Sequence, residues 1–336
     1  MRFALVDSGL GVLPAAMHLR RLCPGAELVL SIDPEGMPWG PRTKEDIAER
    51  ALACAEATLP WEPDVLVLAC NTASVRALDV LRSEFEPAVP VVGTVPAIKP
   101  AAAGGGPVAI WATAATTGSP YQRELIRKFA DGVPVTEVAC PGLAEAIELA
   151  DPDAMADAVG AAVALTPAEA RAVVLGCTQY ELAMDRIRGM LPRVRLYGSA
   201  PAVAAQAIRR MSSRPAASDA AAAVPGGQRQ ASGAAASPVA AASPSAAASA
   251  SPGAAETSGQ PAEQGRWAAF GIGEPSASIA ASPEGTRGDG GPAGDGQRVP
   301  EVHVLLSGAR GELPTAARRY AEGRLLAGLR LPSTAA

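Results

Sequence analysis

The sequence predicts an α/β protein with two similar halves, each built on a parallel sheet and each supplying one thiol. Two apolar runs, residues 65–69 and 172–176, have the length and β-branched content of buried parallel strands. The first run ends at Cys70 and the second at Cys177, and small hydrogen-bonding residues follow each cysteine. Ligands bind at the carboxyl ends of strands in open α/β sheets, so both thiols stand where chemistry is expected.

A second pair of strand-like runs makes the two halves alike. Residues 3–6 lead into Asp7, and residues 108–112 lead into Thr113, in each case a strand followed by a polar loop. Asp7 stands 63 positions before the first cysteine, and Thr113 stands 64 positions before the second. This spacing predicts two similar units that each supply one thiol.

Length and composition limit the class of protein. With 336 residues the chain can form about two domains and a sizeable core. Its net charge of −5 leaves no basic field for a phosphate backbone, so we expect no nucleic-acid partner. Asp7 interrupts the first apolar run too early for a signal peptide, and no apolar run has the ~18 residues and membrane character of a span. We therefore expect a cytoplasmic protein without membrane contact. The chain has five cysteines without zinc-type spacing, which indicates that the thiols are reduced.

The first half is expected to occupy residues 1–97, with a return of the C-terminal chain to this half as an option. A glycine-containing loop at 8–11 opens the first helix, and Thr43 is a suitable N-cap for the second. Proline and glycines at 34–40 indicate a fixed turn before that second helix. The expected strands are 3–6, 27–31, 64–69 and 89–92, and the expected helices are 13–23, 44–58 and 74–85.

The second half is expected to occupy residues 98–211. A glycine run at 104–106 precedes its first strand, and a loop rich in hydroxyl groups follows that strand. One helix carries both Glu145 and Glu148. The expected strands are 108–111, 135–138, 172–176 and 194–197, and the other expected helices are 121–130, 155–165, 180–190 and 200–211.

The composition changes sharply after the second half. Residues 212–298 consist mainly of Ala, Ser, Pro, Gly and Gln, with too few large apolar side chains to offset chain entropy. We interpret this tract as a long disordered insertion. At residues 299–330 a strand over 302–308 and a helix over 313–329 are expected to complete the fold.

The residue inventory excludes several mechanisms. His18 and His303 are the only histidines, which leaves almost no material for a histidine-ligated metal or a Cys–His pair. None of the three lysines stands at a strand exit, where a pyridoxal Schiff base is expected. The phosphate-binding glycine pattern with its lysine is absent as well. We expect neither a metal nor a cofactor.

What remains is the pair of thiols. Each cysteine stands a few residues ahead of a predicted helix, whose N-terminal amides favour the thiolate, so either could act as a base near neutral pH. Two such groups facing one substrate from opposite sides predict proton removal on one face and proton delivery on the other, which is racemisation. For either cysteine alone, an inert core residue is the alternative.

Six motifs occur in order along residues 1–211, and the pattern resumes at 302–327. They are Asp7-Ser8-Gly9-Leu10-Gly11, Pro38-Trp39-Gly40, Ala69-Cys70-Asn71-Thr72-Ala73-Ser74, Ala112-Thr113 with Thr116-Thr117-Gly118-Ser119, Ala139-Cys140-Pro141 with Glu148, and Leu175-Gly176-Cys177-Thr178. Together they resemble the glutamate racemase family of the aspartate/glutamate racemase superfamily.

The resemblance implies two pseudo-symmetric parallel-sheet α/β domains with the active site between them. It also implies a cofactor-independent interconversion of L- and D-glutamate that supplies D-glutamate for peptidoglycan. It gives Cys70 and Cys177 the two acid/base roles, with Asp7 assisting the first cysteine and Glu148 beside the second. The residues that it implies for holding glutamate are Ser8, Pro38, Trp39, Gly40, Asn71, Thr72, Thr116, Thr178 and Gln179. Simpler local roles stay open, since Asp7 could cap the next helix, Glu148 could be a solvated helix charge and the threonines could be ordinary N-caps. The oligomeric state is open too, with a homodimer as one option.

Four positions depart from the pattern. Gln179 stands where the family usually has histidine, and glutamine cannot take up or release a proton. Trp39 replaces a tyrosine, Val12 a common glycine, and Gly198 an aspartate. We expect weak but real activity, and two alternatives remain open: a related racemase acting on aspartate or another substrate, or a catalytically silent amino-acid binder.

Overall fold

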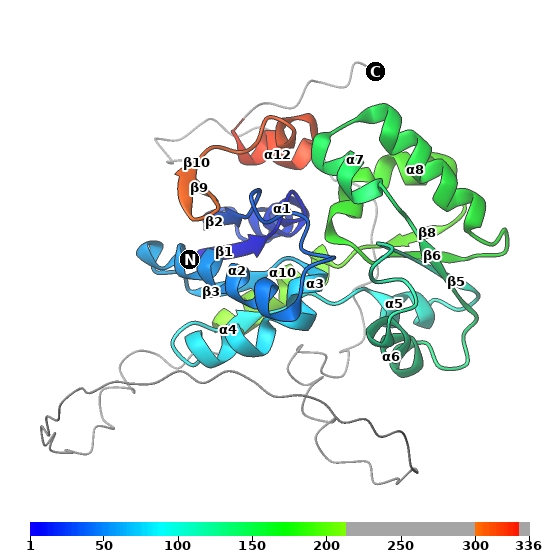
Figure 1. Cartoon of the computed structure of the whole chain (residues 1–336), viewed down its shortest axis with the longest axis horizontal. Helices are drawn as coiled ribbons and strands as arrows, with labels where there is room; N and C mark the ends of the chain where they lie inside the picture. Colours follow the sequence, from blue (N-terminus) through cyan, green and yellow to red (C-terminus); the bar gives the residue numbers. More distant parts are fainter. Residues whose placement is uncertain (213–299, 329–336) are drawn as a thin grey trace, which may run out of the picture.

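The computed structural model describes residues 1–212 and 300–328, which form two lobes, each organised around one β-sheet (Figure 1). The sheet of the first lobe has the strand order β10-β9-β2-β1-β3-β4, and all neighbouring pairs are parallel except β9 with β10. Its strands are β1 (Arg2–Asp7), β2 (Glu27–Ile32), β3 (Val65–Leu68), β4 (Val91–Val92), β9 (Val302–Leu306) and β10 (Ala309–Gly311).

The sheet of the second lobe is fully parallel, with the order β6-β5-β7-β8. In both sheets the strand that precedes a cysteine lies beside the first strand of its lobe, which is the predicted near-repeat. The fold class predicted from the sequence is confirmed. The strands of this sheet are β5 (Val108–Ala112), β6 (Val135–Ala139), β7 (Ala172–Leu175) and β8 (Arg195–Tyr197).

Helices cover both faces of the first sheet, because alternate side chains of its buried strands point to opposite sides. Phe3 and Leu5 of β1 pack into one core cluster with α1, whereas Ala4 and Val6 pack into another with α2. Thr43 caps α2 as expected, accepting a hydrogen bond from the Asp46 amide. The helices and the 3-10 turn of this part of the chain are α1 (Val12–Leu22), α2 (Lys44–Glu56), η1 (Leu59–Trp61), α3 (Asn71–Arg76), α4 (Leu78–Phe85) and α5 (Ile98–Ala103).

The second sheet is also covered on both faces. Ile98 of α5 and Leu125 of α6 pack on one side with Val108 and Ile110, while Trp111 faces the cluster on the other side. Figure 1 shows α5 and α6 on one side of this lobe and α7 and α8 on the other. The helices after α5 are α6 (Pro120–Phe129), α7 (Leu143–Leu149), α8 (Pro152–Leu165), η2 (Thr178–Ala183), α9 (Met184–Met190) and α10 (Ala200–Ser212).

Two predicted helices are divided in the structure. The one expected over 74–85 begins earlier, as α3, and breaks at Ala77, where the backbone leaves helical geometry (φ −122, ψ −11) before α4. The one expected over 180–190 begins at Thr178 as the tighter 3-10 helix η2 and becomes α-helical only at Met184. Both helices therefore begin directly after a cysteine, closer to the thiol than expected.

Helix α10 returns to the first lobe, although its residues fall in the range expected for the second half. It packs against α1 and β3, and Val203, Ala204 and Ala207 are buried in the same cluster as Leu13 and Ala16. The chain therefore crosses between the lobes twice within residues 1–212.

The end of the chain differs from the single helix expected over 313–329. It forms the short helices η4 (Ala317–Arg319) and α12 (Ala321–Leu326), separated by Tyr320 in extended conformation (φ −92, ψ 150). The Tyr320 hydroxyl donates a hydrogen bond of 2.5 Å to the Ile147 carbonyl of α7. This buried hydrogen bond stabilises the interruption between η4 and α12 and connects the end of the described chain to the second lobe.

The predicted insertion at 212–298 lies, except for Ser212, outside the described residues. Within residues 1–212 and 300–328, no helix combines the length and hydropathy of a membrane span.

Candidate active site

A cavity of about 300 Å³ lies at the carboxyl ends of the strands, with walls from both lobes. All the site residues predicted from the sequence line the cavity except Glu148. Glu148 accepts a hydrogen bond from Gln179, which does line it. The first lobe contributes Asp7, Ser8, Pro38, Trp39, Gly40, Pro41, Cys70, Asn71 and Thr72, and the second contributes Thr113, Ala114, Ala115, Thr116, Cys140, Pro141, Gly142, Ala144, Glu145, Gly176, Cys177, Thr178 and Gln179.

The two cysteines occupy equivalent positions in the two lobes. Cys70 follows β3 with φ −125 and ψ 125 and immediately precedes α3, while Cys177 follows β7 with φ −128 and ψ 135 and immediately precedes η2. The same extended backbone followed by a helical turn presents each thiol to the cavity. The structure thus brings the two thiols to one cavity from opposite lobes, as the sequence predicted.

The ionisation of the thiols differs from the sequence-based expectation. Burial raises the pKa of Cys177 to about 12, although the backbone amides of Gln179 and Tyr180 act in the opposite direction. Burial and the nearby Asp7 carboxyl raise the pKa of Cys70 well above its ordinary value, again against two helix amides. The amides favour the thiolate as predicted, but loss of hydration is the larger effect. Both cysteines are therefore thiols near neutral pH unless a positive charge enters the cavity.

Asp7 is a buried carboxyl group with an unusually high pKa. Burial and the charge of Glu148 raise this pKa from 3.8 to about 7, although the hydrogen bonds that it accepts lower it. The Ser8 amide donates to Asp7 Oδ1 at 2.6 Å, and the hydroxyl of Thr178, from the other lobe, donates to Oδ2 at 3.2 Å. Asp7 can therefore exchange a proton near neutral pH, next to Cys70.

Gln179 connects Cys177 to Glu148. The Cys177 thiol donates to Gln179 Oε1 over 3.5 Å, and Gln179 Nε2 donates to Glu148 Oε2 over 2.6 Å. The same carboxylate oxygen accepts the Leu10 amide of the first lobe at 2.8 Å. Burial raises the pKa of Glu148, against the effect of these two bonds. The amide links thiol and carboxylate without being able to carry a proton.

The position of the Glu148 carboxylate explains why residue 9, in the first motif, is glycine. A Cβ atom at Gly9 would lie 2.4 Å from Glu148 Oε2, far inside van der Waals contact. The loop after β1 must therefore be free of a side chain here for the carboxylate of α7 to reach the Leu10 amide.

Asn71 provides another contact between the lobes. Its Nδ2 donates to the Gly176 carbonyl over 2.9 Å, directly before the second cysteine. Its buried Oδ1 has no hydrogen-bond partner among the described residues. Asn71 thus fixes the two strand exits together and retains one acceptor beside the cavity.

Trp39 forms a rigid part of the wall. Its side chain is 1% exposed, and its indole Nε1 donates to Asp33 Oδ2 over 2.9 Å. Arg50 pairs with the same carboxylate at 3.2 Å. These contacts hold the ring in place, so its extra bulk relative to tyrosine belongs to the shape of the cavity.

Sequence reasoning did not assign site roles to several residues of the lining. Cys140 was visible as a third strand exit, and Glu145 precedes Glu148 by one turn of the same helix. Thr113 donates through its hydroxyl to Thr116, 3.1 Å away. The positions of these residues in the sequence did not show that they line the same cavity.

The charges of the cavity limit what it can hold. Among the described residues that line it, none is lysine, arginine or histidine, and the acids are Asp7 and Glu145. In residues 1–212 and 300–328, no group of three or more His, Cys, Asp or Glu side chains is placed to hold a metal ion. Hydroxyls and backbone amides are the groups available to bind an anion.

Comparison with known proteins gives consistent results. The family model for Asp/Glu/hydantoin racemases matches residues 15–207. A glutamate racemase of Roseiflexus is 40% identical over 206 residues, covering 60% of this chain and 75% of that protein. One from Salmonella gallinarum is 38% identical over 210 residues, covering 59% and 72%.

Solved structures point the same way. The crystal structure of Escherichia coli glutamate racemase with L-glutamate and the activator UDP-MurNAc-Ala superposes with a TM-score of 0.59 at 32% identity, covering 63% of this chain and 83% of that one. A Bacillus anthracis glutamate racemase superposes with a TM-score of 0.53 at 26% identity, covering 63% and 82%.

Proposed function

Because the chain belongs to the Asp/Glu/hydantoin racemase family, a family of isomerases, we propose that it interconverts L- and D-glutamate without a cofactor. The observation that carries this proposal is the placement of Cys70 and Cys177 at equivalent strand exits on two walls of one cavity. In the proposed role the product D-glutamate serves peptidoglycan synthesis in the cytoplasm.

The reaction moves one hydrogen from one face of Cα to the other. One cysteine, as thiolate, removes the Cα proton, and the opposite cysteine, as thiol, protonates the carbanion from the other side. The charge then rests on the second sulfur, so the two residues exchange roles when the reaction runs in reverse. Since enantiomers have equal free energy in water, kcat/KM is the same in both directions, and a defect at either thiol slows both alike.

The charge of the substrate fits the ionisation of the site. Burial keeps both thiols protonated, and a thiolate becomes accessible when a positive charge lies close to it. The ammonium group of an amino acid supplies such a charge. In the proposed complex it lies near Asp7 and the unpartnered Oδ1 of Asn71. Asp7, the buried carboxylate next to Cys70, then accepts the proton that Cys70 releases.

The carboxylates of glutamate require donors rather than cations in this cavity. The hydroxyls of Ser8, Thr72 and Thr116 and the amides that follow each cysteine are the donors that the lining offers. The Escherichia coli relative was solved with L-glutamate, which supports glutamate as the substrate here. Trp39 and Gln179 line the same cavity from the two lobes, and we propose that they modify the rate and the choice of amino acid.

The decisive experiment is racemisation in D₂O. The protein is incubated with L-glutamate, and deuterium at Cα is measured by mass spectrometry together with the D-isomer by chiral chromatography. We expect both to rise together in the wild type, and to be lost in Cys70→Ser and in Cys177→Ser. Cys54→Ala, which changes a buried cysteine of α2 away from the cavity, is the matched control and retains activity.

The same assay separates the alternatives. Deuterium incorporated into aspartate or another amino acid, with none in glutamate, would reassign the substrate. Saturable glutamate binding without any exchange, unchanged by the two cysteine substitutions, would identify a silent binder. Gln179, which cannot carry a proton, is the feature that favours this second reading.

A further inference from the structure

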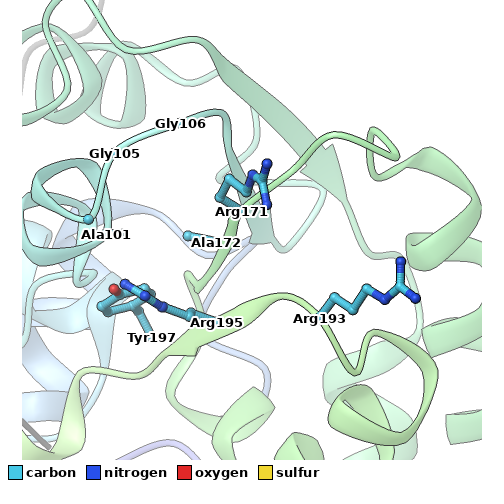
Figure 2. A pocket seen from close by; sticks show the side chains of 9 residues that line it. Ala101, Gly105, Gly106, Arg171, Ala172, Arg193, Arg195 and Tyr197 are labelled. Carbon is cyan, nitrogen blue, oxygen red and sulfur yellow. The ribbon is translucent and has the colours of Figure 1, made fainter.

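A second cavity, of about 400 Å³, lies at the opposite end of the second sheet (Figure 2). Val108, Ala172 and Arg195 begin three adjacent strands and are paired in register, so this cavity lies at their amino ends, while Cys177 follows the carboxyl end of β7. We call it the arginine pocket. Its lining is Ala101, Gly104, Gly105, Gly106, Arg171, Ala172, Arg193, Arg195 and Tyr197.

The positive charges of the arginine pocket are not neutralised by the protein. Among the described residues, none forms an ion pair or a side-chain hydrogen bond with the guanidinium groups of Arg171, Arg193 or Arg195. Arginines elsewhere in the structure do have acidic partners, as Arg50 has Asp33. Three unpaired cations around one hollow, in a chain of net charge −5, concentrate positive potential where an anion can enter.

The glycine loop between α5 and β5 keeps the pocket open. A Cβ atom at Gly104 would lie 3.1 Å from the Tyr197 hydroxyl and 3.7 Å from Arg195 Nη1. At Gly106, whose φ is +83, a Cβ atom would lie 2.6 Å from Cγ of Arg171. Figure 2 shows Arg171, Arg195 and Tyr197 next to this loop, with Arg193 extending on the far side. The absence of side chains at these glycines leaves room for the Tyr197 hydroxyl, the Arg195 guanidinium and the aliphatic part of Arg171.

The elements around the pocket add one opposing effect. The C-terminal end of α5 carries partial negative charge, which disfavours an anion. Gly104 and Gly105 donate their amides to the Ala101 and Ala102 carbonyls, so two of the exposed carbonyls are already satisfied. Three full positive charges outweigh the remaining fraction of a charge at the end of a six-residue helix.

We propose that the arginine pocket is a binding site for a phosphate or diphosphate group, separate from the cysteine cavity. Guanidinium groups bind phosphate oxygens with two parallel hydrogen bonds, and the Tyr197 hydroxyl supplies one more donor. The pocket is larger than the cavity of about 300 Å³ at the cysteines, so it accommodates a diphosphate with part of an attached group. An extended nucleic acid does not fit this description, because the positive charge is confined to one small hollow.

The test uses the full chain and inorganic pyrophosphate as the probe. Isothermal titration calorimetry is carried out at low salt with L-glutamate saturating the cysteine cavity. We expect one pyrophosphate per chain, weaker binding of inorganic phosphate, and a loss of affinity as sodium chloride is added. Arg171→Gln and Arg195→Gln each weaken binding by about tenfold, because each removes a charge-assisted contact. Arg21→Gln, an exposed arginine at the end of α1, is the matched control and leaves the affinity unchanged.

Three outcomes overturn the proposal: no saturable heat with millimolar pyrophosphate, equal affinity in the wild type and in both pocket variants, or binding that occurs only when L-glutamate is left out. Circular dichroism confirms that each variant is folded. Because the readout is pyrophosphate affinity, the result does not depend on whether glutamate is the substrate.

Discussion

Replacing Asp7 by Asn is expected to stabilise the protein at neutral and alkaline pH while impairing its chemistry. The Asp7 carboxyl is buried in the folded chain, and its pKa there is about 7 against an ordinary value of 3.8. Above pH 7 the folded protein therefore holds a buried negative charge that would be better hydrated in the unfolded chain. Asn keeps the shape and can pair with the Ser8 amide and the Thr178 hydroxyl, but it carries no charge.

The magnitude follows from the pKa difference. Each pH unit between the two pKa values corresponds to 1.36 kcal/mol, so a rise from 3.8 to about 7 amounts to about 4 kcal/mol. The folded state binds the proton more tightly than the unfolded state. The contribution of Asp7 to stability is therefore fully present below pH 4 and is lost as the pH rises through 7. Relative to the wild type, Asp7→Asn should gain about 4 kcal/mol of unfolding free energy over this range.

The assay is urea unfolding at pH 4, 5.5, 7 and 8.5, followed by the fluorescence of the buried Trp39 and Trp111. Asp157→Asn, at an exposed position of α8, is the control for a loss of charge in water. A second check is Glu148→Gln, which removes the charge that helps to raise the pKa of Asp7 and so reduces the gain from Asp7→Asn. An advantage of Asp7→Asn that stays constant or shrinks from pH 4 to pH 8.5 would refute the reasoning.

Other substitutions test the contacts of the cavity. Gln179→His places an ionisable ring between Cys177 and Glu148, and we expect kcat/KM to rise by about tenfold or more, equally in both directions; polarimetry from each enantiomer measures it, and an unchanged value contradicts it. Thr178→Val removes a hydrogen bond that lowers the pKa of Asp7, so the acidic limb of the pH profile of kcat/KM should move to higher pH by about one unit. An acidic limb that does not move would show that Asp7 takes no part in the proton transfer. Gly9→Ala forces a Cβ atom onto Glu148 and should lower kcat/KM, while Gly25→Ala, where the added carbon meets nothing within 4 Å, should not; equal rates in the two variants would show that the loop can yield.

The arrangement of the sheets could be predicted from the sequence because it follows from local pattern. Buried parallel strands appear as short apolar runs, and the near-equal spacing of Asp7 to Cys70 and Thr113 to Cys177 reflects the repeated strand order. The return of α10 to the first lobe is not a local property. Its buried face would suit either sheet, and only packing against α1 decides between them.

The break at Tyr320 has a similar origin. The residues around it are compatible with a helix, and the sequence gives no sign that a tyrosine hydroxyl will bond to a carbonyl 173 positions earlier. A contact between residues so distant in sequence overrides helix propensity, which is worth less than about 1 kcal/mol per residue. Such an interruption of a helix can be identified only when the position of the partner element, here α7, is known.

The ionisation of the site shows where reasoning from single residues stops. A cysteine before a helix N-terminus predicts a lowered thiol pKa, and the structure contains those amides. Burial is a property of the closed cavity, to which both lobes contribute, and here it raises the pKa further than the amides lower it. The position of each thiol could be predicted, whereas its proton affinity could not.

Gly198 illustrates how one departure from the family pattern is compensated within the fold. A Cβ atom at this position would lie 2.3 Å from the carboxylate of Glu181, so an aspartate there would collide with a group already present. Glu181 Oε1 accepts the Ser199 amide at 2.7 Å, the Ser199 hydroxyl at 3.0 Å and the Ala200 amide at 3.0 Å. The carboxylate that satisfies the start of α10 thus comes from η2, the segment that directly follows Cys177. Because α10 packs on the first lobe, this bond ties the cysteine segment of the second lobe to the helix that joins the two. The glycine therefore makes room for a buried carboxylate supplied by another element, and it does not indicate a lost function.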